Sequence, residues 1–184
     1  CAAAVTPVAA GEGDGSGPPL QGRQGNVRGI VTLLENGRGF YLEEPAADAD
    51  PRTSDAVFVQ HAHLPAGIEA GAEVSVSGTV AETGEDRDTL TALTATGVPV
   101  VCSSGHSLPL TDVSLPRDGR GRESLEGMRI RLNAPLTVTD VYQFDQGRFT
   151  LGSDGVQYAP TEVMAPGPAT AELIARSRAS TLPV

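Results

Sequence analysis

The chain has 184 residues, and its 13 basic residues, all arginine, stand against 23 acidic ones. The formal net charge of −10 excludes a uniformly basic nucleic-acid-binding surface. No run of about 18 apolar residues occurs, so we expect no membrane-spanning helix within this sequence. The 22 glycines and 14 prolines interrupt the chain too often for a helix bundle and favour many short strands.

The first 23 residues are rich in Ala, Gly, Pro and Ser and follow no strand or helix period, which predicts a flexible tether. Cys1 precedes this tether, as the lipid-carrying cysteine does in a mature bacterial lipoprotein. We therefore expect lipidation of Cys1 and a protein anchored by acyl chains to the outside of the bacterial envelope. The alternative is a sequence boundary that falls on a cysteine by chance. Separately, Cys1 and Cys102, the two cysteines of the chain, allow one disulfide.

Residues 24–100 contain five β-patterned segments separated by turn signals. Gly29 interrupts the first segment, which predicts a bulge or a bend within that strand. Such short, punctuated strands favour a small OB-fold-like barrel, with an SH3-like barrel as the alternative. The five segments are 26–34, 40–44, 56–60, 73–82 and 89–94.

Residues 101–184 repeat this pattern in part. Their β-patterned segments, at 126–144, 147–155 and 156–164, are followed by a short helical stretch at about 169–178. This half has fewer strand candidates than the first. We therefore predict an all-β fold of tandem OB-fold-like barrels, the second of which lacks strands, and a polypeptide that continues beyond Val184.

Two blocks of the chain carry a more specific pattern. The first is GNVRGIVTLLENGRGFYLEEPAADADPRTSDAVFVQ followed by AGAEVSVSGTVAE, and the second contains LEGMRIRL, LTVTDVYQF, GRFTL and APTEVMAPGP. Together they resemble the N-terminal region of large secreted bacterial nucleases, whose catalytic domain is of the endonuclease/exonuclease/phosphatase type. Two positions depart from the family pattern. Ala56 stands where the family often has Gly, and Ala72 stands where it usually has Asp.

The resemblance covers roughly residues 24–180 and implies an accessory module with its catalytic domain beyond Val184. The sequence shows neither an acidic cluster around a metal with a base nor a nucleophile beside a base. We therefore expect no enzymatic activity from this chain by itself. The alternative function is a structural spacer or interaction module of a lipoprotein, without a ligand of its own.

Three residues form a candidate nucleic-acid site. Tyr41 and Phe58 lie on neighbouring predicted strands and on the faces opposite to the apolar pairs of those strands, where OB-folds stack bases. Arg38 lies nearby in sequence for a phosphate. Residues 1–99 hold five arginines against 14 acids, so we expect single-stranded nucleic acid rather than duplex. The alternative is a reversed register in which Phe58 belongs to the core.

Two further segments have candidate roles. Asp48, Asp50 and Asp55 place hard oxygen ligands at short spacing, which predicts a calcium site, with a solvated turn as the alternative. Residues 117–131 contain five of the 13 arginines. This segment is expected to contact either nucleic acid or the acidic first half of the chain.

Overall fold

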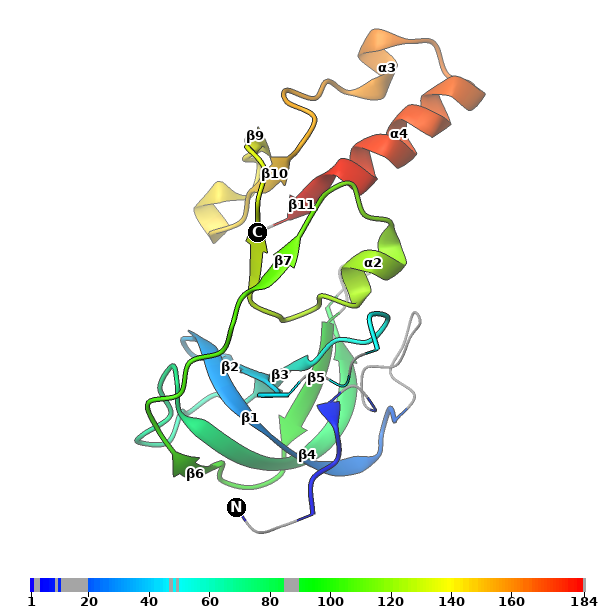
Figure 1. Ribbon diagram of the computed structural model, residues 1–184. Helices are drawn as coiled ribbons and strands as arrows, with labels where there is room; N and C mark the ends of the chain where they lie inside the picture. Colours follow the sequence, from blue (N-terminus) through cyan, green and yellow to red (C-terminus); the bar gives the residue numbers. More distant parts are fainter. Residues whose placement is uncertain are drawn as a thin grey trace. The chain divides into compact units, whose positions relative to one another are not determined.

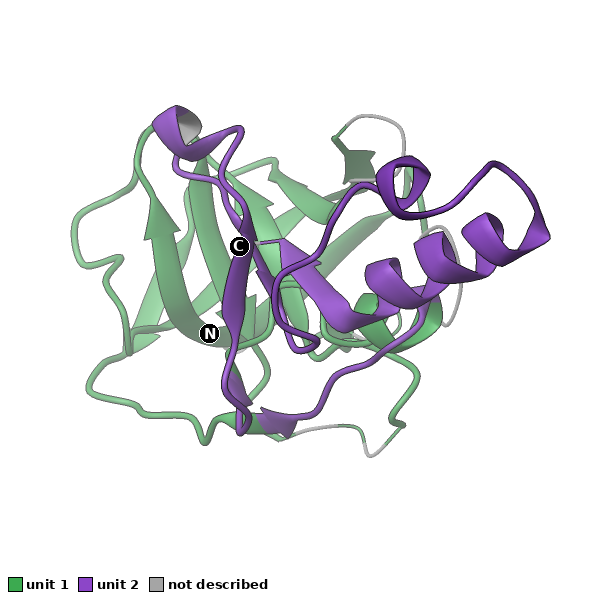
Figure 2. Ribbon diagram, turned by 90° about the horizontal axis from the view of Figure 1, so that it is seen from above, with its two compact units in different colours: residues 1–111, 120–130 green, residues 112–119, 131–184 purple. Residues whose placement is uncertain are grey.

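A computed structural model describes residues 1, 4–8, 10, 20–46, 48, 50–84 and 90–183 (Figure 1). It divides into two compact units, coloured separately in Figure 2. The first comprises 1–111 and 120–130, and the second comprises 112–119 and 131–184. The first unit thus extends to residue 111 rather than to the predicted boundary at residue 100, and it also includes residues 120–130. Among the described helices, none has the length and hydropathy needed to cross a membrane.

The first unit contains a β-sheet closed into a barrel. β1 pairs with β2, β2 with β3 and β5 with β4, all antiparallel, while β3 and β5 run parallel. A further pairing of β1 with β4 closes the ring, and β6 adds to the edge of β4. This confirms the predicted all-β, OB-like small barrel. The strands are β1 (Gln24–Glu35), β2 (Gly39–Glu43), β3 (Ala56–Gln60), β4 (Glu73–Thr83), β5 (Leu90–Ala95) and β6 (Val100–Ser103).

The long strand β1 pairs with β2 along its C-terminal part and with β4 along its N-terminal part. Ile30 pairs with β2 and also with β4. A Cβ atom at the preceding residue, Gly29, would lie 2.8 Å from the backbone oxygen of Glu43, so only glycine fits there without displacement. The predicted irregularity is therefore present, and the register shift itself falls between Val31 and Leu33.

The barrel core follows the predicted alternation of side chains. Phe40 and Leu42 of β2 are completely buried, and Val57 and Val59 of β3 face the same interior. Burial of such a side chain stabilises the fold by about 1.5–3 kcal/mol. Strand β3 differs from the prediction in one respect, because all of its residues except the last are buried. Both faces of this strand are therefore covered.

The described N-terminal residues 4–8 pack against the barrel, which corrects the prediction of a free tether for this stretch, whereas residues 11–19 of the predicted tether lie outside the described residues. Thr6 donates its backbone N–H to the backbone oxygen of Asn26 at 2.7 Å. Val8 belongs to the barrel core, and its backbone N–H donates to Glu44 Oε1 at 2.9 Å. An apolar side chain seven residues after Cys1 thus keeps this end of the chain in place.

The second unit lacks barrel strands, and its strands β9 (Thr137–Asp140), β10 (Thr150–Gly152) and β11 (Thr181–Pro183) form an open three-stranded sheet. The predicted helix is confirmed as α4 (Pro168–Ser180). The predicted strand at 156–164 is wrong, because its C-terminal part is α3 (Pro160–Val163). Proline at the first helical position favours this outcome. A two-stranded sheet joins β7 (Thr111–Val113) to β8 (Ile130–Leu132), and α2 (Gly119–Glu123) lies between these strands in the sequence.

Candidate functional site: the covered face of the barrel

The structure brings the three predicted nucleic-acid residues together. Tyr41 and Phe58 are directly opposite each other in the β2–β3 ladder, with ring centroids 4.9 Å apart. The guanidinium carbon of Arg38 lies 5.8 Å from the centroid of the Phe58 ring, within the range of a cation–π contact. The prediction that the two aromatic residues share one face is therefore confirmed.

The Phe58 ring on that face is not available for stacking, which corrects the part of the stacking hypothesis that uses Phe58. Phe58 is only 1% exposed, and Tyr41 is half-buried. Stacking of a base requires an open ring face, which Phe58 lacks. Arg38 remains largely exposed and forms an ion pair with Glu35 at 2.7 Å. Phe58 is thus buried although the strand has the predicted register, with Val57 and Val59 facing the core. The reversed register considered as the alternative is not present.

Residues 120–130, here called the cover segment, belong to the same unit as the barrel. They comprise most of α2 and the chain that follows it in Figure 1. Ser54 donates its hydroxyl to the backbone oxygen of Glu126 at 2.6 Å, and Arg129 donates its backbone N–H to Glu43 Oε2 at 3.1 Å. The arginine-rich segment therefore contacts the acidic first half of the chain, which was one of its two predicted contacts.

Gly127 is the point at which the cover segment approaches Tyr41 most closely. Its φ of +68° lies in the left-handed region, which residues other than glycine adopt only at a cost in energy. A Cβ atom added there would lie 3.2 Å from Cδ1 of the Tyr41 ring and 3.5 Å from Cβ of Ala56. Glycine thus supplies both the backbone conformation and the space that this contact requires.

The contact between the cover segment and the barrel is strongly acidic. Burial, and then the charge of Glu123, raise the pKa of Glu126 to about 7, although the N–H of Thr91 lowers it by donating to Oε1 at 3.1 Å. Burial also raises the pKa of Glu123, and the charge of Glu82 adds to this. Charged carboxylates are disfavoured in such a partly dry site.

Two further groups under the cover segment are perturbed in the same direction. Burial raises the pKa of Glu43, against the lowering effect of its hydrogen bond from Arg129. Burial raises the pKa of Tyr41 to about 12, and the charge and hydrogen bond of Glu35 contribute to the shift. The face therefore favours neutral, protonated side chains.

The carboxylates of the predicted calcium residues accept hydrogen bonds from within their own loop. Asp48 accepts from the backbone N–H of Asp50 at 2.7 Å and from the Thr53 hydroxyl at 3.0 Å. Asp50 binds the Arg52 guanidinium at 2.7 Å, and Asp55 accepts from the backbone N–H of Asp48 at 3.1 Å. Among the described residues, no group of three metal-binding side chains is assembled. The loop has the geometry of the alternative, a set of Asx turns.

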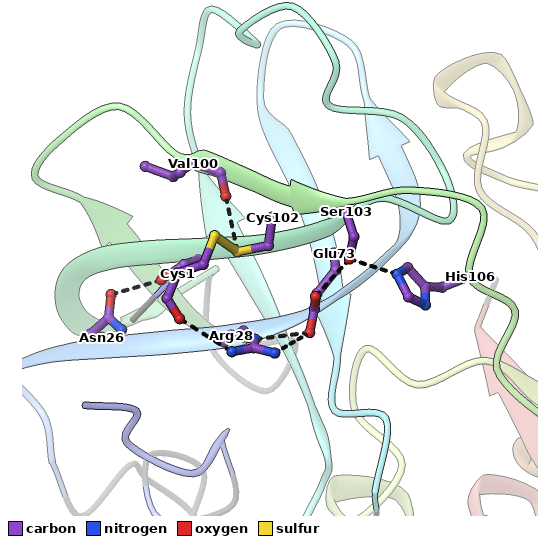
Figure 3. The surroundings of a disulfide bond; sticks show 9 residues. Cys1, Asn26, Arg28, Glu73, Val100, Cys102, Ser103 and His106 are labelled. Atoms are coloured by element: carbon purple, nitrogen blue, oxygen red, sulfur yellow. Dashed lines mark hydrogen bonds and ion pairs between the residues drawn. A yellow bond between two sulfur atoms is a disulfide. The ribbon is translucent and has the colours of Figure 1, made fainter. Parts of the chain in front are cut away.

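Cys1 is linked to Cys102 by a disulfide across 101 positions of sequence, as Figure 3 shows. Arg28 donates to the backbone oxygen of Cys1 at 3.2 Å and pairs with Glu73 at 2.7 Å. Lipidation of Cys1 requires the same sulfur atom in a thioether. The disulfide therefore replaces the prediction of a lipid on this sulfur.

A serine and a histidine beside the disulfide are not arranged as a nucleophile and an oriented base. The Ser103 hydroxyl lies 2.8 Å from Nε2 of His106 and also 2.8 Å from Oε2 of Glu73 (Figure 3). The carboxylate thus contacts the serine, whereas in a catalytic triad it contacts the second nitrogen of the histidine. This arrangement ties the strands together by hydrogen bonds.

The sequence predicted a contact of residues 117–131 with the acidic first half of the chain, but not that the cover segment lies against the β2–β3 face. The signal was the five arginines of 117–131 in an acidic chain, three of which lie in the cover segment. Comparison with models of protein families, with curated proteins and with solved structures finds no match to this chain.

Proposed function

We propose that this chain is a non-catalytic structural or interaction module of an exported protein, whose barrel carries no nucleic acid on its β2–β3 face. The observation that supports this proposal is the 1% exposure of Phe58, on a face whose Tyr41 ring contacts the chain's own cover segment at Gly127. OB-folds bind oligonucleotides through this face and the adjoining loops. In this protein the cover segment contacts the face where a bound strand would lie.

Export is supported by the disulfide between Cys1 and Cys102. Disulfides persist in oxidising compartments such as the periplasm or the cell exterior and are rare in the cytosol. The bond also holds the start of the chain against the barrel near β6. A barrel braced at its N-terminal end is well suited to act as a rigid spacer between other parts of an envelope or secreted protein.

A second candidate is the nucleic-acid-binding accessory module of a secreted nuclease, which the sequence resemblance suggests. The structure contains exposed aromatic residues suited to stacking, although they lie in the second unit. Tyr142 is 90% and Phe144 66% exposed, and Arg148 follows in the same connection between β9 and β10. Each stacked base contributes about 1–3 kcal/mol. This candidate therefore moves the binding site from Tyr41 and Phe58 to residues 142–148.

One titration separates the two candidates. A fluorescently labelled single-stranded oligonucleotide is titrated with the wild-type chain, a Tyr142→Ala/Phe144→Ala double variant and a Tyr41→Ala variant. The structural proposal predicts no binding up to about 100 μM protein. Binding that the double variant abolishes would establish the second candidate, and binding that Tyr41→Ala abolishes would show that the barrel face is in use.

A further inference from the structure

The cover segment closes over the barrel through contacts of two kinds. Two of them do not use the Glu126 carboxylate: the Ser54 hydroxyl donates to the backbone oxygen of Glu126, and the Arg129 N–H donates to the Glu43 carboxylate, whose pKa burial also raises. The third joins the Thr91 N–H of β5 to the carboxylate of Glu126 itself. Closure therefore holds the half-buried Glu126 carboxylate against the barrel.

Closure also brings like charges together. Glu126 faces Glu123 of its own segment and Glu82 of β4, and each of these charges raises its pKa. Oε2 of Glu82 is buried and, among the described residues, has no hydrogen-bond donor. Arg122 is the cation that acts on Glu123. Three carboxylates in a partly desolvated site repel one another unless a proton is shared among them.

Among the described residues, Tyr41 of β2 also faces Glu126, and Glu43 of β2 contacts the segment at Arg129. The Tyr41 hydroxyl donates to Glu35 at 3.3 Å, and Arg38 acts on it with the opposite sign. Burial keeps this hydroxyl protonated throughout the neutral range, so it supplies no competing charge. The Glu126 cluster is therefore the part of this interface that changes charge near neutrality.

We propose that the cover segment is a pH-sensitive latch, which is held most firmly in mild acid and released from the β2–β3 face as the pH rises through neutrality. The inference does not depend on the proposed function, because it concerns the cover segment and not a ligand. Its consequence is that the Tyr41 ring, which Gly127 contacts in the closed form, becomes accessible on the alkaline side, so the covering of this face that supports the proposed function belongs to the acid side.

The direction of the effect follows from proton linkage. When the segment is closed, the pKa of Glu126 is raised to about 7, whereas a solvated glutamate ionises near 4.5. The closed form thus binds the proton more tightly, and closure is fully favoured below the lower value. It weakens as the pH rises between the two values and reaches its minimum above about 7. Between pH 5 and pH 8 the opening equilibrium should increase roughly 10- to 100-fold.

Amide hydrogen exchange of the intact chain measures this opening. Exchange rates of the Thr91 and Arg129 amides, whose acceptors are Glu126 and Glu43, are divided by the intrinsic rate at each pH to give protection factors. The Val31 amide, which donates to the backbone oxygen of Ala72 inside the barrel, reports on the barrel alone. We expect the Thr91 and Arg129 protection factors to fall between pH 5 and pH 8 while that of Val31 stays constant.

Two variants test the assignment to Glu126. Glu126→Gln keeps an acceptor for the Thr91 amide and removes the titration, so its protection factors should not change with pH. Glu69→Gln alters an exposed glutamate and should behave as the wild type does. A wild-type protein whose protection is independent of pH would overturn the proposal. So would a fall of equal size in Glu126→Gln. If Glu126→Gln does not fold, the wild-type profile with Val31 as reference decides.

Discussion

Truncation of Phe58 discriminates between an exposed stacking residue and the buried residue seen in the structure. Phe58 is 1% exposed, packs 4.9 Å from the Tyr41 ring and lies beneath the guanidinium of Arg38. Phe58→Ala removes a buried aromatic ring and leaves a cavity that the β2–β3 ladder can fill only in part. Such substitutions destabilise proteins by about 3–5 kcal/mol. We expect a loss of about 4 kcal/mol in the free energy of unfolding.

Urea denaturation followed by far-ultraviolet circular dichroism measures this loss. Phe144→Ala is the matched control, because it makes the same truncation at a ring that is 66% exposed in the second unit. The control should change the free energy of unfolding by no more than about 0.5 kcal/mol. If Phe58→Ala is as mild as the control, the Phe58 ring is open to solvent, and the proposal that this face is closed to stacking is refuted.

Three further predictions concern other parts of the chain. Cys102→Ser should lower the free energy of unfolding by about 2–5 kcal/mol, because the disulfide closes a long loop; a free Cys102 thiol in the exported protein would instead contradict the disulfide. Gly127→Ala should destabilise the first unit by about 0.5–1 kcal/mol more than Gly105→Ala, measured by urea denaturation. Both glycines have positive φ, but only the Cβ at 127 would meet the Tyr41 ring, so equal losses would exclude this contact. The hydrogen bonds from Arg52 lower the pKa of Asp50 to about 2, so Arg52→Gln should raise that pKa in a carboxyl nuclear magnetic resonance titration. An unchanged Asp50 pKa would show that the pair does not persist in solution.

Local pattern was enough to predict most of the barrel. The alternation in 40–44 and 56–60 placed Phe40, Leu42, Val57 and Val59 in the interior, where the structure has them. Each of these strands has its own period-two pattern and ends at its own turn, so neighbouring residues carry the information. The helical pattern near 169–178 was likewise sufficient to predict α4, because helical periodicity is also local.

Only the tertiary structure decided what happens on the outer face and at the two ends of the first unit. The face that Phe58 shares with Tyr41 is contacted by a segment more than 60 residues later in the chain, and no pattern within β3 records that return. The fate of Cys1 was decided in the same way, by its pairing with Cys102 in the folded chain. Contacts between segments far apart in sequence depend on the fold of the whole chain. For this reason Tyr41 and Phe58, which the sequence predicts to form a nucleic-acid site, lie on a covered surface in the structure.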